Sequence, residues 1–208
     1  MAKKDLDNIV NDIPALDHLA GRFLFIKDEV LRENVTIAFQ YIIFLISIES
    51  EITWQGSIIY SIFKDVMVYT GSVVESCLHY CVKEYFKANK LNRADVMTYE
   101  WKIDKHISIY KIDETKEVCS LIRHKKMEDF CDQTQFKDIN NIAKKAGILT
   151  DDLFKKAEKI REDRNKVHLV ALGKTHDYFT KDNVEASFKS AKEIIERIES
   201  KLLEKQEE

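Results

Sequence analysis

One short segment of the sequence combines permanent cations with a group that titrates near neutral pH. Arg161, Arg164 and His168 stand at positions i, i+3 and i+7, and Asn165 directly follows the second arginine. On a helix these positions share one face, because residues three, four and seven apart lie above one another. Two guanidinium groups can grip a phosphodiester, and a histidine can move a proton at physiological pH. The segment is therefore the candidate site for phosphate chemistry.

Lysines lie close to this candidate site in the sequence. Lys156, Lys159 and Lys166 belong to the same expected helix, and they are candidates for contact with an RNA backbone. Charge runs more often line a solvated helix face, so an exposed basic turn with a packed histidine is the alternative interpretation. The residue types alone leave both interpretations open.

The overall composition limits which phosphate chemistry is available. The chain has 208 residues, of which 45% are hydrophobic and 33% charged, with a formal net charge of −3, five glycines and one proline. The glycines are too far apart for the loop of a Rossmann or P-loop nucleotide site, so side chains must hold any phosphate. The mild acidity excludes a bulk polyanion binder and leaves room only for a local basic patch.

The four cysteines predict neither a disulfide framework nor a metal site. Cys77, Cys81, Cys119 and Cys131 form no Cys-x-x-Cys pair and lack zinc-ribbon spacing. The first two are one helical turn apart among apolar residues, which favours core packing. Residues 1–12 are polar and lack the apolar core of a signal peptide. We therefore expect a cytoplasmic protein with reduced thiols, no metal, no cofactor and no membrane association.

Helical periodicity dominates the elements that must position the candidate site. The expected helices run from Pro14 to about 27, over 29–51, over 58–88, from 136 to before Gly147, from Thr150 through the site, and from Thr180 or Asp182 to about 204. The apolar stretch at 35–48 is too short to span a bilayer and predicts a buried helix at the centre of a bundle.

A period of two interrupts the helices at about 98–124. Hydrophobic residues there alternate with polar ones, which is typical of a strand with one covered face. The hydrophobic residues are Trp101, Ile103, Ile107 and Ile109. The returning strand is expected at 118–122. The predicted fold is thus a single all-α domain over residues 1–208, a bundle of five or six helices with a small β-hairpin insertion.

The run IREDRNKVHL at 160–169 resembles the signature of HEPN domains, the helical "higher eukaryotes and prokaryotes nucleotide-binding" family. That motif is an arginine, four to six residues, and a histidine, often with an Arg-Asn pair nearby. The spacing favours Arg161 as the motif arginine, whereas the Arg-Asn pair is Arg164-Asn165, so both assignments stay open. Glu162 departs from the small polar residue that is common after the motif arginine. The order of long helix, strand pair and motif helix also resembles bacterial HEPN-like proteins of defence or toxin–antitoxin type.

The resemblance implies a metal-independent endoribonuclease. A ribose 2′-OH would attack the adjacent phosphorus and leave a 2′,3′-cyclic phosphate and a 5′-OH. His168 would be the general acid or base, Arg161 or Arg164 would stabilise the phosphorane, and Asn165 would orient the histidine or hold a phosphate oxygen.

The resemblance also implies partners and an alternative function. Members commonly form homodimers in which two motifs face one cleft, and an antitoxin or a nucleotidyltransferase is a further partner. Many members are inactive. The alternative is therefore a non-catalytic module for RNA binding, dimerisation or partner docking, with Arg161 or Arg164 buried in salt bridges to Glu162, Asp163 or a neighbouring helix.

Overall fold

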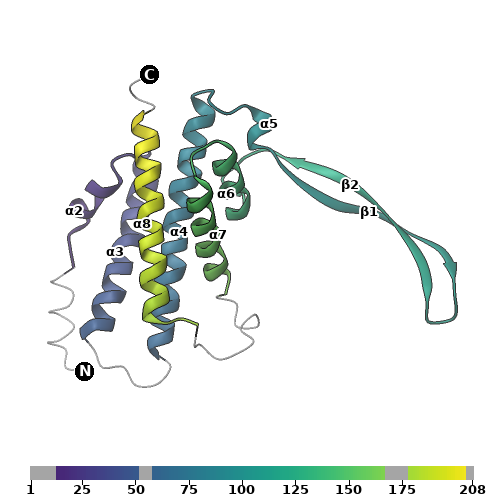
Figure 1. Cartoon of the computed structure of the whole chain (residues 1–208), viewed down its shortest axis with the longest axis horizontal. Coiled ribbons are helices and arrows are strands. Elements are labelled where there is room, and N and C mark those ends of the chain that lie inside the picture. The colour runs from purple at the N-terminus through teal and green to yellow at the C-terminus, as the bar shows by residue number, and fades with distance from the viewer. Residues whose placement is uncertain (1–12, 52–57, 167–177, 205–208) are drawn as a thin grey trace.

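The protein is mostly helical, with one β-hairpin that leaves the helical part (Figure 1). The computed structural model describes residues 13–51, 58–166 and 178–204. Its elements in chain order are α2 (Leu16–Ala20), the 3-10 helix η1 (Gly21–Phe23), α3 (Glu29–Glu51), α4 (Ile58–Lys87), α5 (Arg93–Val96), β1 (Thr98–Lys111), β2 (Glu117–Glu128), α6 (Phe136–Lys145), α7 (Asp151–Asn165) and α8 (Lys181–Glu204).

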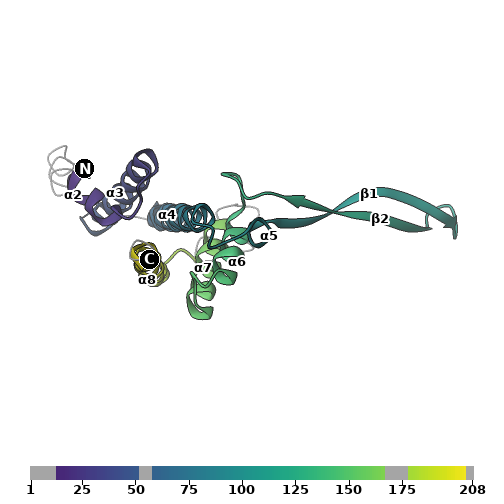
Figure 2. The same cartoon turned by 90° about the horizontal axis from the view of Figure 1, so that it is seen from above.

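Helix α4 is the central element of the bundle. It packs against α3, α6, α7 and α8, and Figure 2 shows it between α3 and the α6–α7 pair. Its buried residues recur every three or four positions, as its sequence predicted, and include Val66, Val74, Cys77 and Cys81. The two cysteines are free thiols in the core, so the expectation that they serve packing is confirmed.

Helix α3 has the predicted bounds, but the prediction that it lies at the centre is wrong. It lies at the side of the bundle (Figure 2), and Ile37, Tyr41 and Ile46 on it are exposed. An apolar run marks a helix as hydrophobic but does not show how many other helices surround it. Helix α4 packs against more helices than α3 does. The stretch at 35–48 predicts a segment too short to span a bilayer, whereas the whole segment Glu29–Ser50 is long and apolar enough to cross a membrane by length and composition. A core helix of a soluble protein also has this length and composition, so they do not by themselves indicate a membrane span. A cytoplasmic location stays a prediction.

The connection between α6 and α7 follows the predicted signals and fixes where the site helix begins. Gly147 has φ +69°, the left-handed conformation that glycine adopts at little cost after a helix end. The N–H of Ile148 donates to the carbonyl of Ala143 at 3.0 Å. Thr150 caps α7, with its hydroxyl accepting a hydrogen bond from the N–H of Leu153.

The first expected helix is shorter than predicted. It divides into α2 and η1 and ends at Phe23, with Ala15 in the capping position, so Pro14 precedes the helix instead of starting it. Sequence reasoning also missed α5, a single turn that Asn92 and Asp95 stabilise as a capping box.

The hairpin is longer than predicted, and its expected covered face is absent from the described structure. The two strands pair antiparallel from Thr98↔Glu128 to Lys111↔Glu117 and extend away from the bundle (Figures 1 and 2). Trp101 and Ile103 are 61% and 62% exposed. The alternation of residue types is genuine, but within the described residues no other element lies over either face of the strands.

Candidate functional site

Three of the four predicted site residues line one cleft. Arg161, Arg164 and Asn165 from α7 border a cavity of about 420 Å³ together with residues from α4 and from the start of α6: Val68, Glu75, Gln135, Phe136 and Lys137. The 15-residue helix α7 ends at Asn165, earlier than the prediction that it runs through the whole motif. Arg164 lies in its last turn and Arg161 about one turn earlier, and both border the cleft. His168 lies outside the described residues.

Arg161 is held by a carboxylate of its own helix. Its Nη2 lies 2.8 Å from Oε2 of Glu158, and its Nε lies 3.1 and 3.2 Å from the two carboxylate oxygens. Asn140 on α6 donates to the same carboxylate at 2.6 Å. The bonds to Glu158 raise the pKa of Arg161. Burial raises the pKa of Glu158, but hydrogen bonds from Arg161 and Asn140 outweigh it, so the net pKa is lowered and the pair stays ionised.

Arg164 reaches across to the central helix. Its Nη1 lies 2.5 Å from Oε2 of Glu75 on α4, and both side chains are partly exposed, at 32% and 24%. Gly71, one turn before Glu75, makes room for this arginine. A Cβ at Gly71 would lie 3.1 Å from Cδ and 3.2 Å from Cβ of Arg164. The missing side chain of a mid-helix glycine thus lets α7 lie close enough to α4 for the ion pair.

The three lysines predicted to extend the site lie away from the cleft, Lys156 and Lys159 on α7 and Lys166 directly after its end. Lys156 pairs with Asp152 and with Glu193 of α8, at 2.7 and 2.6 Å. Lys159 and Lys166 both pair with Asp163, at 3.0 and 3.2 Å. None of the three borders the arginine cleft, and RNA binding by them stays a prediction.

Asp163 is a buried carboxylate at the centre of a polar network that joins the end of α7 to the chain before α8. The residue is only 4% exposed and also accepts a hydrogen bond from the hydroxyl of Tyr178. Burial works against the charge of Lys159, but hydrogen bonds to Tyr178 and Asp163 outweigh it and raise its pKa. The Nζ of Lys166 lies 3.5 Å from the centre of the Tyr178 ring. These lysines therefore have a structural role in fixing the end of the site helix.

Sequence reasoning missed three polar residues of the cleft: Glu75, Gln135 and Lys137. Glu75 is on α4, Lys137 is on α6 and Gln135 is the capping residue before α6. No local pattern marks them, because only the packing of distant helices brings them to α7. Glu75 and Gln135 also border a second, larger cleft of about 1030 Å³. The lysines Lys83 and Lys87 of that cleft pair with Asp132 and Glu84, so it concentrates neither sign of charge.

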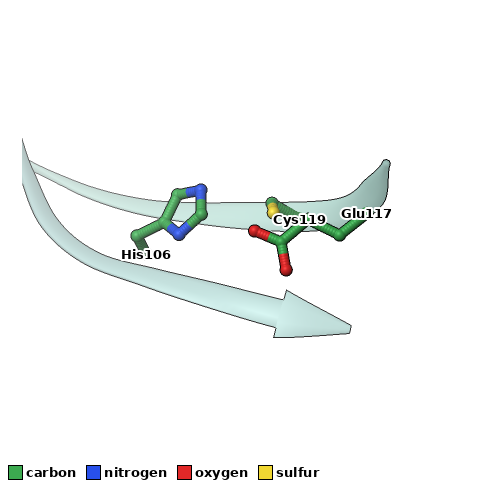
Figure 3. Close-up of side chains that lie close together, drawn as sticks. All are labelled: His106, Glu117 and Cys119. Carbon is green, nitrogen blue, oxygen red and sulfur yellow. The ribbon is translucent and has the colours of Figure 1, made fainter. Parts of the chain in front are cut away.

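The hairpin holds a group of three metal-type donors, shown in Figure 3. His106 on β1 and Glu117 and Cys119 on β2 place one ligand atom each within 4.8 Å of the others. Glu117 also accepts a hydrogen bond from Ser108 at 2.8 Å. Burial and the hydrogen bond to Glu117 raise the pKa of the Cys119 thiol, which favours its protonated form. Structural zinc takes four ligands with deprotonated sulfur, so these three donors form an incomplete zinc site. Hydrogen bonds already join Glu117 to Ser108 and to Cys119.

Comparison of the chain with models of known protein families, with curated proteins and with solved structures found no match. The candidate function accordingly rests on the residues and geometry of the arginine cleft.

Proposed function

We propose that the protein is an RNA-binding module of HEPN-like type that holds an RNA phosphate in the arginine cleft. The observation that carries this proposal is the shared cleft itself, which Arg161, Arg164 and Asn165 border from one side and Lys137 from another. Guanidinium groups bind phosphate oxygens through paired, charge-assisted hydrogen bonds. A cavity of about 420 Å³ is large enough for a nucleotide unit of a single strand.

The ion pairs of the two arginines favour binding over cleavage. Glu158 and Glu75 compensate their charges within the free protein. A phosphate must therefore displace or share each carboxylate, which limits affinity and selects for a ligand with several negative oxygens. A carboxylate within ion-pair distance of each arginine also opposes the extra negative charge that a phosphorane develops. The non-catalytic alternative predicts salt bridges for these arginines, including one to a neighbouring helix, but both arginines are partly exposed instead of buried.

Metal-independent RNA cleavage is the second candidate function. It is supported by Arg161, Arg164 and Asn165, which border one cleft, and by His168, which follows Asn165 three positions later in the sequence. A bacterial defence or toxin role, with an antitoxin or nucleotidyltransferase partner, would follow from this activity and stays a prediction.

One experiment separates the two functions. A fluorescent single-stranded RNA is titrated with the protein in EDTA, and the same samples are run on a denaturing gel. We expect saturable binding, intact RNA, and weaker binding after Arg161→Ala or Arg164→Ala. Arg93→Ala is the control, because it removes an arginine that pairs with Asp129 away from the cleft. Binding unaffected by both cleft variants would exclude the proposed site. Products with a 2′,3′-cyclic phosphate that His168→Ala abolishes would establish the ribonuclease instead.

A further inference from the structure

The hairpin, here called the arm (residues 98–128), has two faces that differ in chemistry. Its strands extend from the bundle and pair only with each other in the described structure (Figure 1). Next to the bundle the register is regular up to residue 103 of β1, and directly paired residues and residues two apart on a strand share a face. Three cross-strand pairs therefore form one face, here called the proximal face: Tyr99–Met127, Trp101–Lys125 and Ile103–Arg123.

Two cations of the proximal face lie against its two aromatic rings. The Nζ of Lys125 lies 3.9 Å from the centre of the Tyr99 ring. The Cζ of Arg123 lies 5.9 Å from the centre of the Trp101 ring. Cation–π attraction holds each cation beside a ring, but both rings stay open to solvent, with Tyr99 49% and Trp101 61% exposed. The proximal face thus presents aromatic rings and permanent positive charge side by side.

The neighbouring carboxylates pair with basic residues of the opposite face. Glu128 lies 2.8 Å from Lys126, and Asp104 lies 3.9 Å from His124. These two basic residues alternate along β2 with the two cations of the proximal face, so they point the other way. Among the residues that the structure describes, no carboxylate forms an ion pair with either cation of the proximal face. The positive charge of this face is therefore available to an anionic ligand.

A single-stranded nucleic acid has the chemistry that matches this face. Its unpaired bases stack on exposed aromatic rings, and its phosphates interact with cations on the same surface. An apolar protein surface would desolvate the two cations without supplying carboxylates, which is unfavourable. An acidic protein surface would engage the cations but would make no use of the two rings.

We propose that the proximal face of the arm binds single-stranded RNA, with bases stacked on Tyr99 and Trp101. Arg123 and Lys125 hold the phosphates of the same strand. Residues two apart on a strand are separated by about 7 Å, so the rings and cations form two successive ring–cation steps along the arm. The choice of RNA over DNA rests on the function proposed for the arginine cleft, whereas the site itself rests on the residues of the arm.

A matched pair of lysine variants tests the phosphate contact by fluorescence anisotropy of a short single-stranded RNA. Lys125→Gln should weaken binding and make the slope of log K against log salt concentration shallower by about 0.7. Lys126→Gln is the control and should leave the slope unchanged, because it removes the same charge one position later, on the face where Lys126 pairs with Glu128. Equal effects of the two variants would show a response to net charge alone and would overturn the assignment to this face.

A second set of variants tests the stacking contact in the same assay. Trp101→Leu should weaken binding about tenfold, the size of one contact between a base and an aromatic ring. Trp101→Phe keeps a ring and should retain most of the affinity. Tyr110→Leu is the control, because Tyr110 is paired with Val118 on the opposite face of the arm, and it should leave binding unchanged. A loss in Trp101→Phe as large as that in Trp101→Leu would contradict stacking.

The fluorescence of Trp101 reports stacking directly. In a Trp54→Phe variant Trp101 is the single tryptophan of the chain. Single-stranded RNA should quench its emission, because a base stacks on the indole, whereas poly-glutamate, a polyanion without bases, should not. Equal quenching by poly-glutamate would indicate an acidic protein partner and would overturn the proposal.

The arm and the arginine cleft are tested separately by the same RNA. Weaker binding in Arg161→Ala and Arg164→Ala, with no effect of Trp101→Leu, would overturn the arm site and leave the cleft. Weaker binding in Trp101→Leu, with no effect of the two cleft variants, would overturn the cleft and leave the arm site.

Discussion

Replacing Glu75 by glutamine should strengthen RNA binding while weakening the fold. Glu75 holds Arg164 at 2.5 Å, and the substitution removes the competing charge but keeps a side-chain oxygen that can accept from the arginine. Because both side chains are partly exposed, solvent screens the pair, and we assign it at most about 1 kcal/mol. If phosphate binding must displace this carboxylate, its removal returns that free energy, which corresponds to about fivefold tighter binding.

The assay is fluorescence anisotropy of a short single-stranded RNA at fixed ionic strength, with thermal unfolding measured in parallel. Asp129→Asn is the matched control, because it also removes one carboxylate from an Arg–carboxylate pair, here with Arg93, outside the cleft. On an Arg164→Ala background, Glu75→Gln should lose its effect, as a double-mutant cycle requires. Unchanged or weaker RNA binding by Glu75→Gln, relative to Asp129→Asn, would refute the reasoning.

Three further predictions concern the elements around the cleft. Gly71→Ala should destabilise the protein by about 1 kcal/mol in chemical denaturation, because overpacking against Arg164 outweighs the gain in helix propensity; a stabilised variant would contradict the close approach. Glu158→Gln should lower the free energy of unfolding at pH 7, because the lowered pKa of Glu158 contributes stability that is lost when the carboxylate is protonated. The difference in unfolding free energy between this variant and wild type should therefore shrink as pH falls below 4.5, and a pH-independent difference would exclude this linkage. A thiol reagent should label Cys131 first, Cys119 more slowly and the two buried α4 thiols only on unfolding, which mass spectrometry can follow; early labelling on α4 would show that this part of the core opens.

The sequence predicted elements whose signals are local. The bounds of α3, the end of α6, the start of α7 and the buried stripe of α4 follow from periodicity, from Gly147 and from Thr150. The central position of α4 could not be read in this way, because apolar runs do not show which neighbours a helix has. The pairing of Arg164 with Glu75 could not be predicted either, since the two residues are 89 positions apart and meet only through helix packing.

The hairpin shows the limit of periodicity in a different way. Alternation correctly indicated strands, but alternation does not show whether an element covers the apolar face, and none of the described elements does. The irregularity between Ile103 and Lys105 also moves later hydrophobic residues to the other face, which no residue type near position 104 signals.

The most direct test of the arginine cleft is the salt dependence of RNA binding. The slope of log K against log salt concentration counts phosphate contacts, at about 0.7 for each contact to a single strand. For the double variant Arg161→Ala with Arg164→Ala, we expect a slope shallower than that of wild type by about 1.4, together with weaker binding. A slope equal to that of the wild-type protein would contradict the claim that these two arginines hold the RNA backbone.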